Sequence, residues 1–133
     1  MTRRLVIGTN NPGKLREFRQ LLDGCGFELV TPRDLGVNFD PEETGGTFAE
    51  NATMKAVEAA RACGLPALAD DSGLEVDHLG GRPGIFSARY AGGERTDPNI
   101  SEARQLELLL EEMQGVPDEQ RTARFRCAIA IAT

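Results

Sequence analysis

The chain has 133 residues, a length that suits one domain with a single hydrophobic core. Its composition, 40% hydrophobic and 27% charged, is typical of a soluble globular protein and unlike that of a disordered one. The net charge of −6 argues against a nucleic-acid partner, which needs a basic surface, but allows a nucleotide whose phosphates bind through a divalent cation.

The first part of the chain predicts a strand, a helix and a second strand. Residues 4–8 are a short apolar run that ends in glycine, which indicates a buried strand. Residues 9–14 are expected to form a loop, because Asn, Pro and Gly dominate them. Apolar residues then recur at helical spacing over residues 15–22, and residues 27–31 predict the second strand. Residues 32–46, polar and rich in Gly and Pro, are expected to be a loop.

A helix-capping motif lies in the middle of the chain. Thr47 and Glu50 form a capping box, in which the threonine hydroxyl accepts from the glutamate amide and the glutamate side chain reaches back to the threonine amide. The helix that this motif opens is expected to end near Cys63. Residues 65–69 predict a strand, which the turn-forming sequence Asp-Asp-Ser-Gly at residues 70–73 is expected to end.

The last part of the chain predicts strand, loop, helix and strand. Residues 74–77 alternate like a half-exposed strand, and residues 78–99 are mostly loop. A third helix is expected over residues 103–113, and the long alternating pattern of residues 122–133 predicts a final strand. We therefore expect an α/β fold, a mixed twisted sheet with flanking helices, in a single domain over residues 1–133. The apolar face of the final strand holds Phe125, Cys127, Ile129 and Ile131.

Nothing in the sequence is typical of an exported or membrane protein. No apolar run approaches the roughly 18 residues that cross a bilayer, and the apolar stretch near the start is too short for a signal peptide. The three cysteines lack CxxC spacing and are expected to be reduced, mostly buried thiols. We expect a cytoplasmic protein with no membrane partner.

A candidate phosphate-binding loop lies between the first strand and the first helix. Exposed amides at a helix N-terminus attract anions, and a lysine there adds a positive charge. The loop is not a Walker A motif, because Leu15 stands where Ser or Thr is required. An ordinary connection between strand and helix is the alternative. The loop residues are Thr9, Asn10, Asn11, Pro12, Gly13 and Lys14.

Acidic residues at two places could hold a cation. Asp70 and Asp71 follow an apolar strand, where α/β proteins bind ligands, although the same residues also suit a turn. Glu42 and Glu43 are either solvated charges or partners of Asp71 on one ion. Lys55 lies on a polar stripe of the second helix, which either is surface or points into the same cleft.

Four blocks of sequence, taken in their order along the chain, resemble those of the inosine triphosphate pyrophosphatase (XTP/dITP diphosphatase) family. The resemblance implies that family's fold and the Mg²⁺-dependent hydrolysis of ITP, dITP and XTP to the monophosphate and pyrophosphate, which cleanses the nucleotide pool. It also implies a homodimer. The blocks are Thr9–Lys14, Glu42–Ala56, Ala69–Leu74 and Gly80–Tyr90, in register over essentially the whole chain.

The resemblance also implies roles for single residues. Asp71 would be the general base that activates water, and Glu42 or Glu43 would share the Mg²⁺ with Asp71. The nucleoside triphosphate would be held by Thr9, Asn10, Asn11, Pro12, Gly13, Lys14, Lys55 and Ser72.

Members of this family also contain a Phe-Gly-Tyr-Asp-Pro block and a Ser-His-Arg block that hold the purine. Neither block occurs in the sequence, so we expect a chain in which the C-terminal part of the family domain is missing. The alternative function is that of an inactive nucleotide-binding or Mg²⁺-binding fragment without base recognition. The Thr-Asn-Asn-Pro-Gly-Lys and Asp-Asp-Ser-Gly blocks argue against a related pyrophosphatase of the Maf type.

Overall fold

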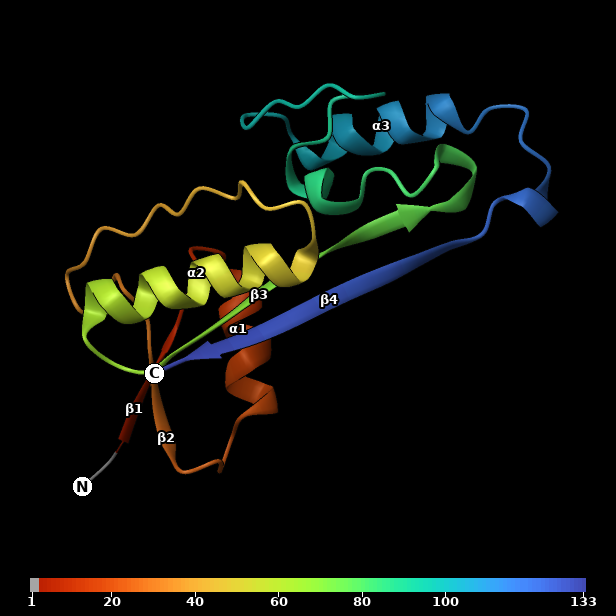
Figure 1. Ribbon diagram of the computed structural model, residues 1–133. Helices are drawn as coiled ribbons and strands as arrows, with labels where there is room; N and C mark the ends of the chain where they lie inside the picture. Colours follow the sequence, from red (N-terminus) through yellow and green to blue (C-terminus); the bar gives the residue numbers. More distant parts are fainter. Residues whose placement is uncertain (1–2) are drawn as a thin grey trace. The chain divides into compact units, whose positions relative to one another are not determined.

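A computed structural model describes residues 3–133, so Met1 and Thr2, the start of the predicted domain, lie outside the described residues. The sheet has four strands in the order β2-β1-β3-β4, and β1 pairs in parallel with both β2 and β3. The predicted α/β class with a mixed sheet and flanking helices is confirmed. The elements in Figure 1 are β1 (Arg3–Ile7), α1 (Pro12–Leu21), β2 (Phe27–Val30), α2 (Phe48–Cys63), β3 (Ala67–Val76), η1 (Asp77–Leu79), η2 (Gly84–Arg89), α3 (Glu102–Glu112), η3 (Asp118–Gln120) and β4 (Ala123–Ala132).

Packing divides the chain into two compact units. The first consists of Met1–Asp71 and Ala128–Thr133, and the second of Ser72–Cys127. Strands β3 and β4 therefore each contribute residues to both units.

In the first unit, α1 and α2 cover opposite faces of the sheet. Val6 packs in a cluster with Ala59 of α2, whereas the next residue of β1, Ile7, packs with Phe18 of α1. Because successive side chains of a strand point to opposite faces, the two helices must lie on the two sides of the sheet. Each face thus has its own small core.

The second unit has a core around Val76 and Met113, and a polar cluster beside it. The Tyr90 hydroxyl donates a hydrogen bond to the Glu112 carboxylate, and the Arg82 guanidinium lies 3.6 Å from that carboxylate. Burial, together with the bond to Glu112, raises the pKa of Tyr90 to about 12. The only tyrosine of the chain is therefore fixed inside this unit.

In the first unit the start of α1 differs from the prediction, whereas α2 starts as predicted and differs only in one capping hydrogen bond. Helix α1 begins at Pro12 rather than after the loop, because Asn11 caps it and proline suits the first helical position. Thr47 caps α2 as predicted and accepts from the Glu50 amide at 3.1 Å. The Glu50 side chain, however, accepts from the Gly46 amide at 2.7 Å, one residue before the expected partner.

The predicted break in the middle of β3 is wrong. Two strands separated by a turn at residues 70–73 were expected, but one strand runs without interruption from Ala67 to Val76. The local sequence favours a turn when it is exposed, whereas here Asp70 and Asp71 are buried and ion-paired with lysines. These tertiary contacts outweigh the turn preference and place both aspartates inside a strand.

The expectation of mostly buried thiols is also wrong, because Cys25 and Cys127 are exposed and only Cys63 is half-buried. Cys25 lies in the turn after α1, and Cys127 lies on the exposed apolar face of β4, where Phe125 is 84% and Ile129 58% exposed.

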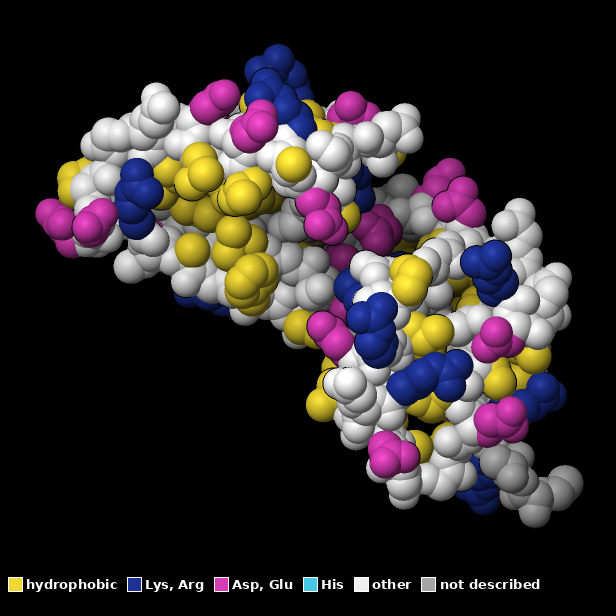
Figure 2. Space-filling model, turned by 180° about the vertical axis from the view of Figure 1, so that it is seen from behind, with side chains coloured by type: hydrophobic (Ala, Val, Ile, Leu, Met, Phe, Trp, Pro, Cys, Tyr) yellow, Lys and Arg dark blue, Asp and Glu magenta, His cyan; other side chains and the backbone are white. Residues whose placement is uncertain are grey.

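Hydrophobic side chains gather in a patch on the face seen in Figure 2. None of the helices in the described part combines the length and the apolar character of a membrane span.

Candidate active site

The predicted phosphate loop connects β1 to α1 and is held by its own side chains. The Asn11 carboxamide oxygen accepts from the Gly13 amide at 2.8 Å and from the Lys14 amide at 3.3 Å. The Thr9 hydroxyl in turn accepts from the Asn11 amide at 3.0 Å. The helix amides that we expected to be free for an anion are therefore already bonded. A phosphate at this position would have to displace the Asn11 oxygen or bind to side-chain donors.

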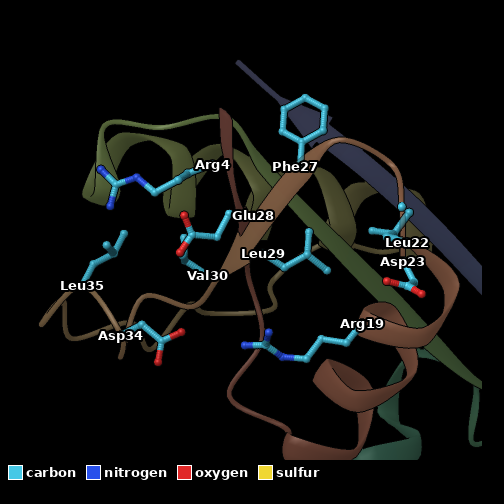
Figure 3. A pocket seen from close by; sticks show the side chains of 11 residues that line it. Arg4, Arg19, Leu22, Asp23, Phe27, Glu28, Leu29, Val30, Asp34 and Leu35 are labelled. Atoms are coloured by element: carbon cyan, nitrogen blue, oxygen red, sulfur yellow. The ribbon is translucent and has the colours of Figure 1, made fainter. Parts of the chain in front are cut away.

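A hollow of about 600 Å³ borders this loop, and Thr9, Asn10, Asn11 and Pro12 form part of its lining. The Asn10 side chain donates to the Phe39 carbonyl at 2.6 Å, which fixes the loop against the opposite wall. Another groove, of about 660 Å³, lies beside β2 and is shown in Figure 3. That groove contains none of the predicted site residues, so size alone does not identify the site.

Two lysines from different helices contact two adjacent aspartates of β3. The Lys14 ammonium of α1 lies 3.1 Å from an Asp70 carboxylate oxygen. The Lys55 ammonium of α2 lies 3.7 Å from Asp71. Since adjacent strand residues point to opposite faces, each aspartate meets the helix that covers its own face. These are the only two lysines in the chain.

Glu43 joins the cluster on the α2 side. Its carboxylate accepts from Lys55 Nζ at 2.9 Å, so one ammonium contacts two carboxylates, those of Glu43 and Asp71. The side chains of Lys55 and Asp71 are only 11% and 7% exposed. Because charges interact more strongly away from water, this ammonium offsets the repulsion between the two acidic groups.

Asn51, one turn before Lys55 on α2, completes the cluster and has no exposed surface. Its carboxamide nitrogen donates to Asp71 Oδ2 at 3.2 Å, and its oxygen accepts from the Gly45 amide at 2.8 Å. No sequence motif indicated a function for Asn51. The only signal was its helical spacing from Lys55, which equally suits a surface stripe.

Burial raises the pKa of Asp71 above its ordinary value. The nearby Lys55 opposes this shift, the negative charge of Glu43 reinforces it, and the hydrogen bond from Asn51 opposes it. A carboxylate with a raised pKa is a better proton acceptor near neutral pH than an ordinary aspartate. Asp71 therefore has the environment of a general base.

A model of the Ham1 family matches residues 5–133. The chain belongs to the Ham1 family. The resemblance inferred from the four sequence blocks is thereby confirmed, and the Ham1 match includes every residue placed in the candidate site above.

Relatives in this family carry names that agree with the resemblance. The dITP/XTP pyrophosphatase of Bacillus subtilis is 47% identical over 127 residues, and that of Escherichia coli K12 is 52% identical over 126 residues. These alignments cover 96% and 95% of this chain but only 62% and 61% of the two relatives. The chain thus spans less than two thirds of the length of the relatives that it matches.

Solved structures of Ham1 proteins have the same fold. The Coxiella burnetii Ham1 protein matches with a TM-score of 0.83 and 41% identity, over 97% of this chain and 62% of its own. The Staphylococcus aureus Ham1 protein matches with a TM-score of 0.79 and 41% identity, over 98% of this chain and 63% of its own.

The remaining predicted residues of the Ham1 chain lie as follows. Glu42 is exposed, so of the two glutamates it is Glu43 that the structure brings to Lys55 and Asp71. Ser72 is half-buried and follows Asp71 on β3 as the first residue of the second unit. The candidate site of the first unit is therefore the cluster of Asn51, Lys55, Glu43 and Asp71 together with the pair of Lys14 and Asp70.

The donor atoms of this cluster fit a hard divalent cation. Among residues 3–133, no group of three or more His, Cys, Asp or Glu side chains is arranged to hold a metal. Glu43 and Asp71 nevertheless both contact the Lys55 ammonium, and burial together with the negative charge of Glu43 raises the pKa of Asp71. Mg²⁺ is commonly bound by one or two carboxylates, with waters and substrate phosphates as its other ligands. Two carboxylates are sufficient for such a site.

Proposed function

We propose that this chain acts as a nucleoside-triphosphate pyrophosphatase that hydrolyses non-standard purine nucleotides (ITP, dITP and XTP) to the monophosphate and pyrophosphate. The observation that carries the proposal is the buried Asp71, whose pKa is raised and which shares the Lys55 ammonium with Glu43. The names of the relatives in the Ham1 family support the choice of substrate. A homodimer stays a prediction from the family resemblance.

Different residues of the site have different roles in the reaction. Asp71 accepts the proton of the attacking water, the water oxygen bonds to phosphorus, and the anhydride bond between the α- and β-phosphates breaks. Pyrophosphate and the nucleoside monophosphate leave as anions. Lys14 and Lys55 bind phosphate oxygens as point charges and stabilise the negative charge that develops on them. The hydroxyl of Thr9 and the side-chain carboxamides of Asn10 and Asn11 orient the phosphate chain.

Mg²⁺ belongs to this proposal as the cofactor. Glu43 and Asp71 would hold it, and when bound it would supply Lewis-acid polarisation of the phosphates. The neighbouring charges support this assignment, since Lys14, Lys55, Glu43, Asp70 and Asp71 together have an excess of negative charge. A polyanionic substrate meets no net positive charge in this cluster unless a cation accompanies it.

The test is pyrophosphate release from ITP by this chain, with and without Mg²⁺, beside the Asp71→Asn variant. Asparagine keeps the shape of the side chain but cannot accept the proton, so the rate should fall by about 10²–10⁴. Arg61→Met, which removes an exposed charge at the other end of α2, is the control and should retain the parental rate. If Asp71→Asn hydrolyses ITP within threefold of the parent, Asp71 is not the base.

A further inference from the structure

We infer that Asn51 is a positioning residue that fixes the separation of Glu43 and Asp71 and thereby sets the affinity of this site for a divalent cation. The inference rests on the proposed function for the identity of the cation. In this role Asn51 contacts neither substrate nor metal and acts only through the two carboxylates.

Both polar ends of the buried Asn51 side chain are hydrogen-bonded. Its relative exposure is 0%, and it joins two segments that are distant in the sequence. One hydrogen bond goes to Asp71 on β3 and the other comes from Gly45 in the loop before α2. A buried carboxamide with both ends bonded has one orientation, because rotating it would break both bonds.

The loop before α2 is held close to the helix at Gly45, beside Glu43. Gly45 follows Glu43 by two residues, and a Cβ atom at Gly45 would lie 2.7 Å from Glu50 Cβ and 2.8 Å from Asn51 Oδ1. Only glycine allows the backbone to approach α2 this closely. The position of the Glu43 carboxylate therefore depends on the hydrogen bond between the Gly45 amide and Asn51.

Glu43 and Asp71 also share a charged contact, the ammonium of Lys55. Lys55 Nζ contacts both Glu43 and Asp71, and it would be drawn toward the phosphates when a triphosphate binds. The neutral Asn51 bonds do not compete with phosphate. They can hold Asp71 and the loop in place before and after substrate arrives, as partners behind metal ligands commonly do.

The experiment is a calorimetric Mg²⁺ titration of the 133-residue chain and of three variants. Asn51→Ala removes both hydrogen bonds, and Gly45→Ala keeps Asn51 but displaces the loop, because the added Cβ would clash with Glu50 Cβ and Asn51 Oδ1. Each should weaken Mg²⁺ binding by at least about tenfold. Gly46→Ala is the matched control, since a Cβ there would meet nothing closer than Glu50 Oε2 at 3.7 Å and Mg²⁺ binding should stay within twofold.

Thermal unfolding of each variant separates positioning from stability. Ala59→Gly, in the core on the same helix, destabilises the fold without touching the site and should leave Mg²⁺ affinity unchanged. The inference is overturned if Gly45→Ala and the folded fraction of Asn51→Ala bind Mg²⁺ within twofold of the parent, or if the parent binds none. A parent that binds Mg²⁺ but releases no pyrophosphate from ITP refutes the proposed activity instead, and the binding ratios then still decide the role of Asn51.

Discussion

Replacing Lys55 by methionine should destabilise the chain strongly when no divalent cation is present. Methionine keeps the apolar stem but removes the ammonium that lies 2.9 Å from Glu43 and 3.7 Å from Asp71. At an effective dielectric constant of about 20, contacts of this length correspond to roughly 4–6 kcal/mol of attraction each before desolvation. Removing one partner of a buried pair leaves the other charge uncompensated and costs about 3–5 kcal/mol. Because Glu43 is 24% exposed, the lower end, about 3 kcal/mol, is expected.

The assay is urea unfolding in a chelating buffer, repeated with Mg²⁺. A cation between Glu43 and Asp71 would replace the missing ammonium, so Mg²⁺ should stabilise Lys55→Met more than it stabilises the parent. Saturation at 100 times the Kd contributes about 2.7 kcal/mol. Arg61→Met removes an exposed charge from the same helix and should change the free energy of unfolding by less than about 0.5 kcal/mol.

The reasoning would be refuted by a Lys55→Met variant that loses less than about 1 kcal/mol, since a loss of that size is typical of an exposed ion pair. Equal stabilisation of parent and variant by Mg²⁺ would refute the claim that cation and ammonium neutralise the same two carboxylates.

Three further predictions concern other parts of the chain. Tyr90 is the only tyrosine and there is no tryptophan, so ultraviolet absorbance should report a titration midpoint at about 12, and Glu112→Gln should move that midpoint back toward about 10. The raised pKa of Asp71 means that its contribution to stability is present below the unfolded value of 3.8 and is lost as pH rises through the folded pKa. Asp71→Asn should therefore raise the free energy of unfolding at neutral pH but leave it unchanged at about pH 3, as measured by urea unfolding at both pH values. Ile129→Lys should lower the light scattering of concentrated protein, because a charge on the exposed apolar face of β4 opposes edge-to-edge pairing, and unchanged scattering would show that this face does not drive association.

The sequence predicts local structure well wherever the deciding interactions are local. The cap at Thr47 and the alternation of β4 follow from residues a few positions apart, and both agree with the structure. The continuity of β3 could not be predicted, because the lysine that pairs with Asp70 lies 56 residues away in the sequence. Asn51 was missed for the same reason, since its partner Asp71 is 20 residues distant.

The sequence also indicated which residue types belong to the site, but not their pairing. Both lysines and both aspartates were candidates, whereas the assignment of Lys14 to Asp70 and of Lys55 to Asp71 requires knowing which helix covers which face of the sheet. The choice of Glu43 over Glu42 depends on the path of a loop. No local pattern determines either.

The adjacency of Asp70 and Asp71 on one strand has a consequence for how this site can vary. The two residues anchor lysines on opposite faces of the sheet, so a deletion or insertion of one residue in β3 before them would exchange the faces that they serve. A deletion would put Asp71 in the place of Asp70 and Ser72 in the place of Asp71, whereas an insertion would put Asp70 in the place of Asp71. Point substitutions along β3 test single contacts, whereas a change of length there breaks both charge pairs and leaves only one aspartate facing a lysine. Variation in chain length should therefore be confined to the loops that flank this strand.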